Sequence, residues 1–387
     1  MKKIITALLI LIFVISCTRK DDHYPPTTND DKKWRVGYYE GGSYKDYQLY
    51  LIALIRGLEK LEWIPKIDIP KLPNNNDTKE LWNFLTTIES KYIEFIGEAY
   101  WSSNWYEDQR KVNKLDATVY LQREKLDLII GGGTWAGDLA NNSHRVPTVI
   151  ISASDPIKAG IIKSAKDSGY DHVHATCDPD RYVRQVRAFY NIIEFKKLGI
   201  VFEDTPDGRV YASLDDVLKV SIQADFDVVT CIASDTNLSE EDSMKGVLKC
   251  HEELATKVDA VYIGAHRGTN SKWMPNVLKP LFDHNIPTFA QEGPDQVERG
   301  VLLSIARVET EDMGLFYAET IAKIFNGISP RIINQVFEQS KRIVINMETA
   351  RRIGLEIPQS IIDTADYVFE EIMSKNTFIV IGVPIKE

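Results

Sequence analysis

The sequence predicts an α/β protein with two lobes, each a parallel sheet covered by helices on both faces. Three observations predict this fold. Leu126–Ile130 and Val146–Ile151 are apolar runs without polar alternation, as expected of strands buried on both faces. Such runs alternate with segments of helical apolar spacing along the chain. Roughly 370 residues follow the N-terminal segment, which is too many for one ordinary core.

The N-terminus has the features of an export signal rather than of a folded element. Residues 1–16, MKKIITALLILIFVIS, join two lysines to an apolar stretch too short to span a bilayer with any margin. The Val-Ile-Ser that precedes Cys17 resembles the lipobox of bacterial lipoproteins, where the signal peptide is cut before a lipid-bearing cysteine. This resemblance implies an exported protein held at a membrane surface by lipid on Cys17. An uncleaved N-terminal anchor is the alternative.

Residues 17–33 are polar, contain two prolines and show no apolar period, which predicts a flexible tether. Within it, Lys20-Asp21-Asp22 resembles a surface-export signal of some Bacteroidetes lipoproteins. A solvated charge run is the simpler interpretation of the same three residues.

The elements that follow are predicted from their apolar spacing. In the first half, a strand is predicted at Trp34–Glu40. A turn of glycine and hydroxyl-bearing residues follows it and leads into a helix. The further elements of this half are a helix at Tyr47–Leu61, a helix at Thr78–Ser90, a strand at Ile93–Ala99, a helix at Arg110–Arg123 and the two buried strands already named.

A second run of alternation predicts the second lobe. Its elements are strands at His172–Thr176, Lys197–Glu203, Asp227–Ile232, Ala260–Gly264, Pro287–Ala290 and Val301–Ile305, and helices at Pro179–Glu194, Val210–Ala224, Glu240–Lys257 and Asn276–His284. A helix at Thr310–Phe325 and a late strand at Arg342–Ile345 suggest that the chain recrosses between the lobes. The tail after Ser374 has the pattern of one extra strand.

Composition excludes several classes of function. The chain has 46 basic and 56 acidic residues and a net charge of -10, without a basic stripe, so no nucleic-acid partner is expected. Beyond Cys17, only Cys177, Cys231 and Cys250 remain, and they show neither CxxC nor His-paired spacing. We therefore expect no metal ion and no cofactor. Whether Cys231 pairs with Cys250 is left open.

Glycines and hydroxyl residues follow the predicted strands of the first lobe, at the edge where open α/β sheets bind ligands. A helix start there offers free N–H groups, although the glycines could equally serve only a tight turn. The candidate ligand-binding residues of this lobe are Gly42, Ser43, Tyr44, Gly133, Thr134, Trp135, Ser152, Ser154 and Asp155.

These candidates have different expected roles. Thr134 and the N–H groups near Trp135 are expected to hold a carboxylate. The serines can be donors to the ligand or simple turn residues, and Asp155 before a proline favours bracing the turn. Tyr44, Trp101 and Trp135 are candidate walls for a flat or apolar ligand. In the second lobe, the candidates at or just after strand ends are Asp204, Arg209, His266, Arg267 and Glu292. Of these, Arg209 and Glu292 can equally be solvated rim.

The chain resembles the ABC transporter substrate-binding proteins of the tryptophan/tyrosine-binding type, which have the type I periplasmic-binding fold. The strongest likeness is the segment Ile345–Glu371, INMETARRIGLEIPQSIIDTADYVFEE. Gly133-Thr134, Asp155-Pro156 with Ala159-Gly160, and Glu311–Gly314 match further blocks in the same order. The resemblance runs from about Trp34 to Glu371.

This resemblance implies two Rossmann-like lobes joined by a multi-strand hinge, with crossings near 176–179, 308–310 and 331–341. The first lobe would comprise 34–176 plus 309–330, and the second 177–308 plus 331–387. A small ligand would bind in the cleft, and the closed monomer would dock on an ABC permease in the membrane.

The alternatives to transport are ligand sensing and enzymatic catalysis. A ligand-sensing accessory subunit without a transporter has the same fold, so the sequence does not separate it from a transport protein. An enzyme is disfavoured, because Gly131-x-Gly133-x-x-Ala136 does not follow the first strand of its unit as a dinucleotide fingerprint should. The sequence also lacks GxSxG and HExxH motifs.

The resemblance also bears on the ligand. Amino-acid binders of this type tend to hold the ammonium through a second-lobe aspartate, but His266-Arg267-Gly268-Thr269 stands in that place. An arginine offers only donors and would repel an ammonium. Either Asp204 or Glu292 then takes the ammonium, or the ligand has a second anionic or carbonyl-rich group or a flat ring that stacks on Arg267. The second outcome is favoured.

Overall fold

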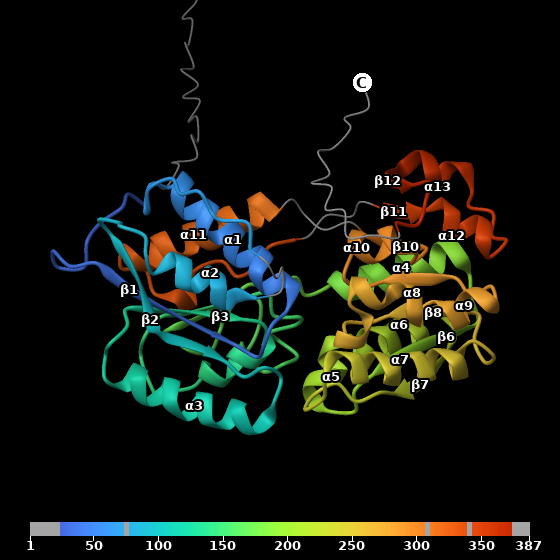
Figure 1. The fold of residues 1–387 in the computed structure, drawn as a ribbon, viewed down its shortest axis with the longest axis horizontal. Coiled ribbons are helices and arrows are strands. Elements are labelled where there is room, and N and C mark those ends of the chain that lie inside the picture. Colours follow the sequence, from blue (N-terminus) through green and yellow to red (C-terminus); the bar gives the residue numbers. More distant parts are fainter. Residues whose placement is uncertain (1–23, 73–76, 306–309, 339–342, 374–387) are drawn as a thin grey trace, which may run out of the picture.

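The computed structural model describes residues 24–72, 77–305, 310–338 and 343–373. These residues form two lobes side by side, each built on its own sheet (Figure 1). The predicted two-lobed α/β fold is confirmed. Cys17, the predicted site of lipid attachment, and the predicted strand after Ser374 lie outside the described residues.

The first lobe contains a wholly parallel five-stranded sheet in the order β2-β1-β3-β4-β5. The central strand β3 is buried over its whole length, because its apolar residues face a core on either side of the sheet. The strands are β1 (Trp34–Glu40), β2 (Ile93–Ser102), β3 (Leu128–Gly132), β4 (Thr148–Ile151) and β5 (Val173–Ala175).

Helices cover both faces of this sheet. The first core lies between the sheet and α1 (Lys45–Lys60), α2 (Thr78–Leu85) and α11 (Thr310–Phe325). The second core lies under α3 (Glu107–Gln122) and the short 3₁₀ helix η1 (Thr134–Leu139). The helix α11 comes from far along the chain and packs closely on α1, as Figure 1 shows.

The second lobe contains a seven-stranded sheet in the order β12-β11-β10-β9-β8-β6-β7. All neighbouring strands are parallel except β10 and β11, which run antiparallel. The strands are β6 (Lys197–Phe202), β7 (Asp227–Ile232), β8 (Ala260–Ile263), β9 (Thr288–Ala290), β10 (Leu303–Ile305), β11 (Ile343–Asn346) and β12 (Ala365–Phe369). The edge strand β12 was not predicted, because its residues are only alternately half-buried.

Two helices that were predicted for the second lobe are interrupted in the structure. The helix expected at Val210–Ala224 is broken, since Ser213 adopts a left-handed conformation with φ of +56°. The helix expected at Asn276–His284 is also two helices, and Pro280 lies in the first turn of the second one, where its missing N–H costs no hydrogen bond. The helices and 3₁₀ turns of this lobe are α4 (Arg181–Ile193), α5 (Pro206–Tyr211), α6 (Leu214–Ala224), α7 (Glu240–Leu254), η2 (Arg267–Thr269), η3 (Ser271–Trp273), α8 (Met274–Val277), α9 (Lys279–Asp283), α10 (Pro294–Glu298), α12 (Met347–Arg352) and α13 (Gln359–Thr364). The 3₁₀ turn η4 (Pro330–Ile332) packs against β5 of the first sheet.

Two chain crossings lie side by side at the hinge. The N–H of Cys177 donates to the Gln335 carbonyl at 2.8 Å, and the N–H of Phe337 donates to the Cys177 carbonyl at 3.1 Å. Ile333 and Phe337 pack on the core of the first lobe, so this part of the returning segment lies against that lobe. The exact division into domains otherwise stays a prediction.

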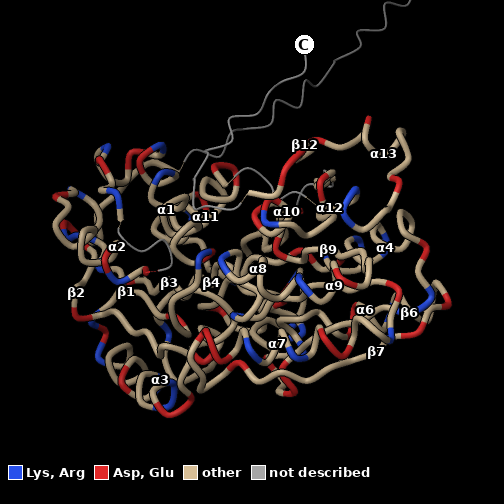
Figure 2. Tube along the Cα trace, turned by 45° about the vertical axis from the view of Figure 1, so that its right-hand side comes forward, with Lys and Arg blue, Asp and Glu red and all other residues tan. Residues whose placement is uncertain are grey.

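The structure also decides what composition left open. Cys231 on β7 forms a disulfide with Cys250 on α7, and Cys177 is a buried free thiol. Acidic and basic residues are interspersed over both lobes without a continuous basic stripe in this view (Figure 2). Within the described ranges, no helix has the length and apolarity needed to cross a membrane.

Candidate ligand-binding cleft

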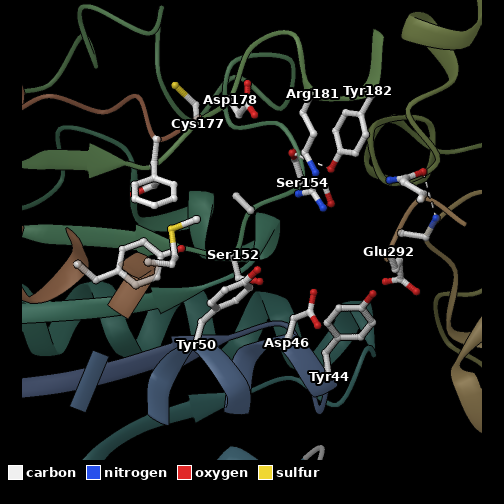
Figure 3. A pocket seen from close by; sticks show the side chains of 17 residues that line it. Tyr44, Asp46, Tyr50, Ser152, Ser154, Cys177, Asp178, Arg181, Tyr182 and Glu292 are labelled. Carbon is white, nitrogen blue, oxygen red and sulfur yellow. Dashed lines mark hydrogen bonds between the residues drawn. The ribbon is translucent and has the colours of Figure 1, made fainter. Parts of the chain in front are cut away.

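The carboxyl ends of strands from both sheets border one cleft between the lobes. Its part nearest the crossings, here called the hinge pocket (Figure 3), is lined by Tyr44, Asp46, Tyr50, Ser152, Ala153, Ser154, Thr176, Cys177, Asp178, Arg181, Tyr182, Ala265, Gln291, Glu292, Met313, Tyr317 and Phe337. Its other part, the Trp105 pocket, is lined by Tyr44, Tyr47, Trp105, Ser152, Ser154, Tyr211, Asp235, Ala265, His266 and Arg267. Four residues line both pockets, so the two are parts of one site.

Of the predicted residues in the first lobe, three line the cleft. Tyr44 is the N-cap of α1 and faces both pockets. Ser152 follows β4 in a left-handed conformation with φ of +58°, and this turn brings Ser152 and Ser154 to the cleft. The Ser154 carbonyl accepts a 3.0 Å hydrogen bond from the hydroxyl of Tyr182, across the boundary between the lobes.

The glycine after β3 has a different role from the expected one. Gly133 has φ of +77°, and a Cβ built on it would lie 1.8 Å from the hydroxyl oxygen of Tyr47. Only glycine fits here, because both the backbone conformation and the space exclude a side chain. The close approach that this glycine allows in the structure is that of the Tyr47 ring.

Thr134 and Trp135 lie behind the cleft and line neither pocket. The Thr134 hydroxyl accepts a 3.4 Å hydrogen bond from the N–H of Ser154, so it braces the serine turn. Trp135 is 1% exposed and packs between the Trp105 ring and the guanidinium of Arg110, which lies 4.4 Å from its ring centroid. The expectation that Thr134 holds the ligand carboxylate directly therefore has no support in this geometry.

Several further candidates also serve the scaffold. Gly42 packs against Trp105. Ser43 is exposed, and its backbone carbonyl accepts a 3.1 Å hydrogen bond from Trp105 Nε1. Asp155 accepts the N–H groups of Ile157 and Lys158, both at 3.0 Å, which braces the turn. Trp101, expected as a possible wall, is buried and donates from Nε1 to Asp116.

The second-lobe candidates divide in the same way. Asp204 and Arg209 form an exposed ion pair with each other and line neither pocket. Glu292 lines the hinge pocket, where its Oε2 accepts from Gln296 Nε2 at 3.0 Å. His266 and Arg267 line the Trp105 pocket.

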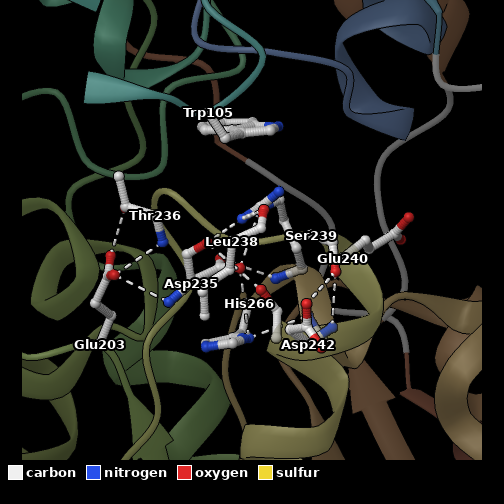
Figure 4. Close-up of polar contacts among 12 residues, drawn as sticks. Trp105, Glu203, Asp235, Thr236, Leu238, Ser239, Glu240, Asp242 and His266 are labelled. Carbon is white, nitrogen blue, oxygen red and sulfur yellow. Dashed lines mark hydrogen bonds and ion pairs between the residues drawn. The ribbon is translucent and has the colours of Figure 1, made fainter. Parts of the chain in front are cut away.

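Sequence reasoning missed Asp235, which lies near His266 in Figure 4. Asp235 neutralises Arg267. Arg267 Nε lies 2.9 Å from Asp235 Oδ1, and the Arg267 N–H donates to Oδ2 at 3.1 Å. Burial alone would raise the pKa of Asp235, but the neighbouring Arg267 and His266 side chains hold it below the usual range. Arg267 is thus not an unpaired cation, and its paired charge is no longer a reason to expect repulsion of an ammonium.

A signal for Asp235 exists in the sequence, because it closes the Ala-Ser-Asp turn after β7 as the other candidates close theirs. Arg181 and Tyr182 were missed because they open a helix after a hinge crossing rather than after a strand. The aromatic residues of α1 and α11 were missed because their helical spacing predicts core. The missed cleft residues that matter most are Asp46, Tyr47, Tyr50, Trp105, Asp178, Arg181, Tyr182, Tyr211, Asp235 and Tyr317.

Comparisons with known proteins agree with this architecture. A family model of ABC transporter substrate binding proteins matches residues 101–369. The chain belongs to this family. It is therefore a substrate-binding protein and not an enzyme.

Individual relatives are more distant. This substrate-binding protein is 23% identical over 237 residues to the tyrosine-binding protein of Clostridioides difficile (strain R20291), a match that spans 60% of this chain and 64% of that relative. A structure of an ABC domain in complex with L-Trp from Streptococcus pneumonia superposes with a TM-score of 0.66 at 18% identity, covering 87% of this chain and 100% of that one. A conserved domain protein from Vibrio cholerae gives 0.65 at 20% identity with the same coverage. These structures confirm the type I periplasmic-binding fold.

Proposed function

We propose that this protein is a lipid-anchored, exported solute-binding protein that closes on a small amino-acid-like, carboxylate or flat-ring ligand and delivers it to an ABC importer. The proposal rests mainly on the cleft, which is lined by tyrosines from both lobes and by the serines that follow β4. Tyr44, Tyr50 and Tyr317 come from the first lobe and Tyr182 from the second. Phenol rings offer flat apolar walls with a polar edge, which suits aromatic or zwitterionic solutes.

The relatives support the same class of ligand. One relative is named for tyrosine, and one structure of the same fold holds L-Trp. Delivery to a permease is proposed from membership of the family alone. An uptake assay separates it from a sensing role, since cells lacking a transport protein should lose import of the ligand.

Ligand binding can be tested by thermal unfolding with amino acids, carboxylates, purines and sugars. A compound that binds only the folded protein raises the melting temperature by mass action. Ala265 lines both pockets, so Ala265→Trp should fill the cleft and abolish the shift while the ligand-free protein remains folded. If no compound stabilises the wild type, or if Ala265→Trp binds as the wild type does, the cleft is not the binding site.

Anchoring can be tested separately. Cys17→Ala should leave the protein unprocessed or free of membranes, because the cleavage and acylation signal centres on that thiol. Cell fractionation and mass spectrometry of the N-terminus measure this. A variant that fractionates like the wild type, together with a wild type that has no lipid, would contradict the lipobox prediction.

A further inference from the structure

Arg181 is the single Lys or Arg side chain among the residues that line the hinge pocket. It is the first residue of α4, and Figure 3 shows it pointing into the pocket beside Ser154 and Tyr182. In the described part of the chain, its guanidinium has no hydrogen bond or ion pair, and its Nε is fully buried without a partner. Arg184, one turn further along, is by contrast paired with Asp178. Within the described ranges, the pocket thus presents a cation that no ion pair neutralises.

A second polar group of the same pocket also lacks a partner. Thr176 lies on the first hinge crossing and is 8% exposed. Its hydroxyl oxygen is fully buried, and the described structure gives it no hydrogen bond. Buried polar groups are normally satisfied, and each exception calls for a reason. Here two exceptions, one from a hinge crossing and one from a helix start, line one pocket.

We propose that Arg181 and Thr176 form an anion subsite, which takes the carboxylate of the ligand at the hinge end of the cleft. The inference rests on the proposed function and deepens it by naming the charge that the ligand must carry and the residues that hold it. A guanidinium and a hydroxyl are both donors, which a carboxylate can accept from with its two oxygens. The first turn of α4 adds the positive end of its dipole.

The rest of the pocket constrains the remainder of the ligand. Asp46 and Glu292 also line the pocket. In Figure 3, Asp46 lies below Arg181, and Glu292 lies below and to the right of it. Their carboxylates favour a positive group at the end of the ligand away from Arg181. Tyr50, Tyr182 and Tyr317 supply flat walls for the part of the ligand between its two charged ends. A zwitterion whose carboxylate points at the hinge satisfies both ends.

The experiment compares probes that differ only in the carboxylate: tyrosine with tyramine, tryptophan with tryptamine, and indole-3-acetate with indole-3-acetamide. Titration calorimetry should show that the wild type binds the carboxylate member of at least one pair more tightly by roughly 10- to 100-fold. Arg181→Gln should remove that preference, Arg181→Lys should keep part of it, and Thr176→Val should reduce it. Arg187→Gln is the matched control, because Arg187 is exposed on the same helix and bonds to Gln223.

Thermal unfolding without ligand distinguishes a binding role from a structural one. Removing an unpaired, partly buried charge should leave the melting temperature of Arg181→Gln equal to or above that of the wild type. A clear fall in that temperature would make Arg181 a structural residue and overturn the inference. Equal binding of tyrosine and tyramine, or failure of every carboxylate probe while an uncharged solute binds, would overturn it and leave the proposed function intact. Failure of every compound in the screen would overturn both.

Discussion

At the scale of single residues, the cleft is shaped by side chains whose partners lie far away in the sequence. Tyr47 fills the space above Gly133, and Asp235 neutralises Arg267. Glu40 is the last residue of β1, and its side chain is buried, since the residue is only 1% exposed. It accepts hydrogen bonds from the hydroxyls of Thr78 at 2.7 Å and Tyr100 at 3.2 Å. Burial nevertheless raises the pKa of Glu40 to about 7, and these hydrogen bonds only partly oppose the rise.

The raised pKa of Glu40 predicts how stability depends on pH. Because the folded protein holds this proton more tightly than the unfolded chain does, the contribution of Glu40 is fully present below pH ~4.5 and is lost as the pH rises through about 7. The loss is roughly 3 kcal/mol, from 1.36 kcal/mol per pKa unit. Glu40→Gln should therefore gain stability relative to the wild type between pH 5 and pH 8, measured by urea unfolding. A difference between the two proteins that stays constant over this range would contradict the prediction.

At the scale of elements, the first lobe depends on one close helix pair. The helices α1 and α11 cross where Gly57 and Gly314 face each other. A Cβ on Gly314 would lie 2.2 Å from the Ala53 carbonyl oxygen, and a Cβ on Gly57 would lie 2.5 Å from the Gly314 carbonyl oxygen. The absence of side chains lets the two backbones touch. This contact joins a segment that returns from the second lobe to the first helix of the fold.

A methyl group at this crossing should destabilise the protein. Gly314→Ala has to push the helices apart, so we expect a loss of about 1–3 kcal/mol of unfolding free energy despite the better helix propensity of alanine. Gly246→Ala in α7 is the matched control. A Cβ there meets only the Ala233 side chain at 3.4 Å, and the change should be neutral or stabilising by up to about 1 kcal/mol. Equal effects of the two substitutions in denaturant unfolding would show that α1 and α11 are not held this closely.

At the scale of the whole molecule, the structure has the lobes in contact across the cleft. Arg110 of α3 pairs with Asp207 of α5 at 2.9 Å, and Lys158 lies 2.5 Å from Asp216 of α6. The N–H of Asn237 donates to the Trp105 carbonyl at 2.9 Å. These contacts would be lost if the lobes moved apart, so they favour the closed form.

Weakening one such contact should lower the affinity for ligand without touching the pocket. Asp207→Asn removes the charge opposite Arg110, which should reduce the population of the closed form and weaken binding by roughly two- to fivefold. Small-angle X-ray scattering should show a larger radius of gyration for Asp207→Asn than for the wild type. Asp204→Asn is the control, because its ion pair with Arg209 lies within the second lobe and outside both pockets. If both variants bind alike, the contact between Arg110 and Asp207 does not stabilise closure.

The sequence by itself determined most of the alternating strands and helices and the two-lobed α/β class, because apolar periodicity is a local consequence of which faces are buried. It also located the turns at Tyr44, Ser152 and Ser154, since strand ends with small residues can be recognised locally. Local pattern does not say which groups meet across the fold. Only the tertiary structure decided the antiparallel pairing of β11, the Cys231–Cys250 bond and the contact between Asp235 and Arg267, which lie 32 residues apart in the sequence. The same holds for the Arg181 guanidinium, because only the folded arrangement shows that no hydrogen bond or ion pair reaches it from the described residues.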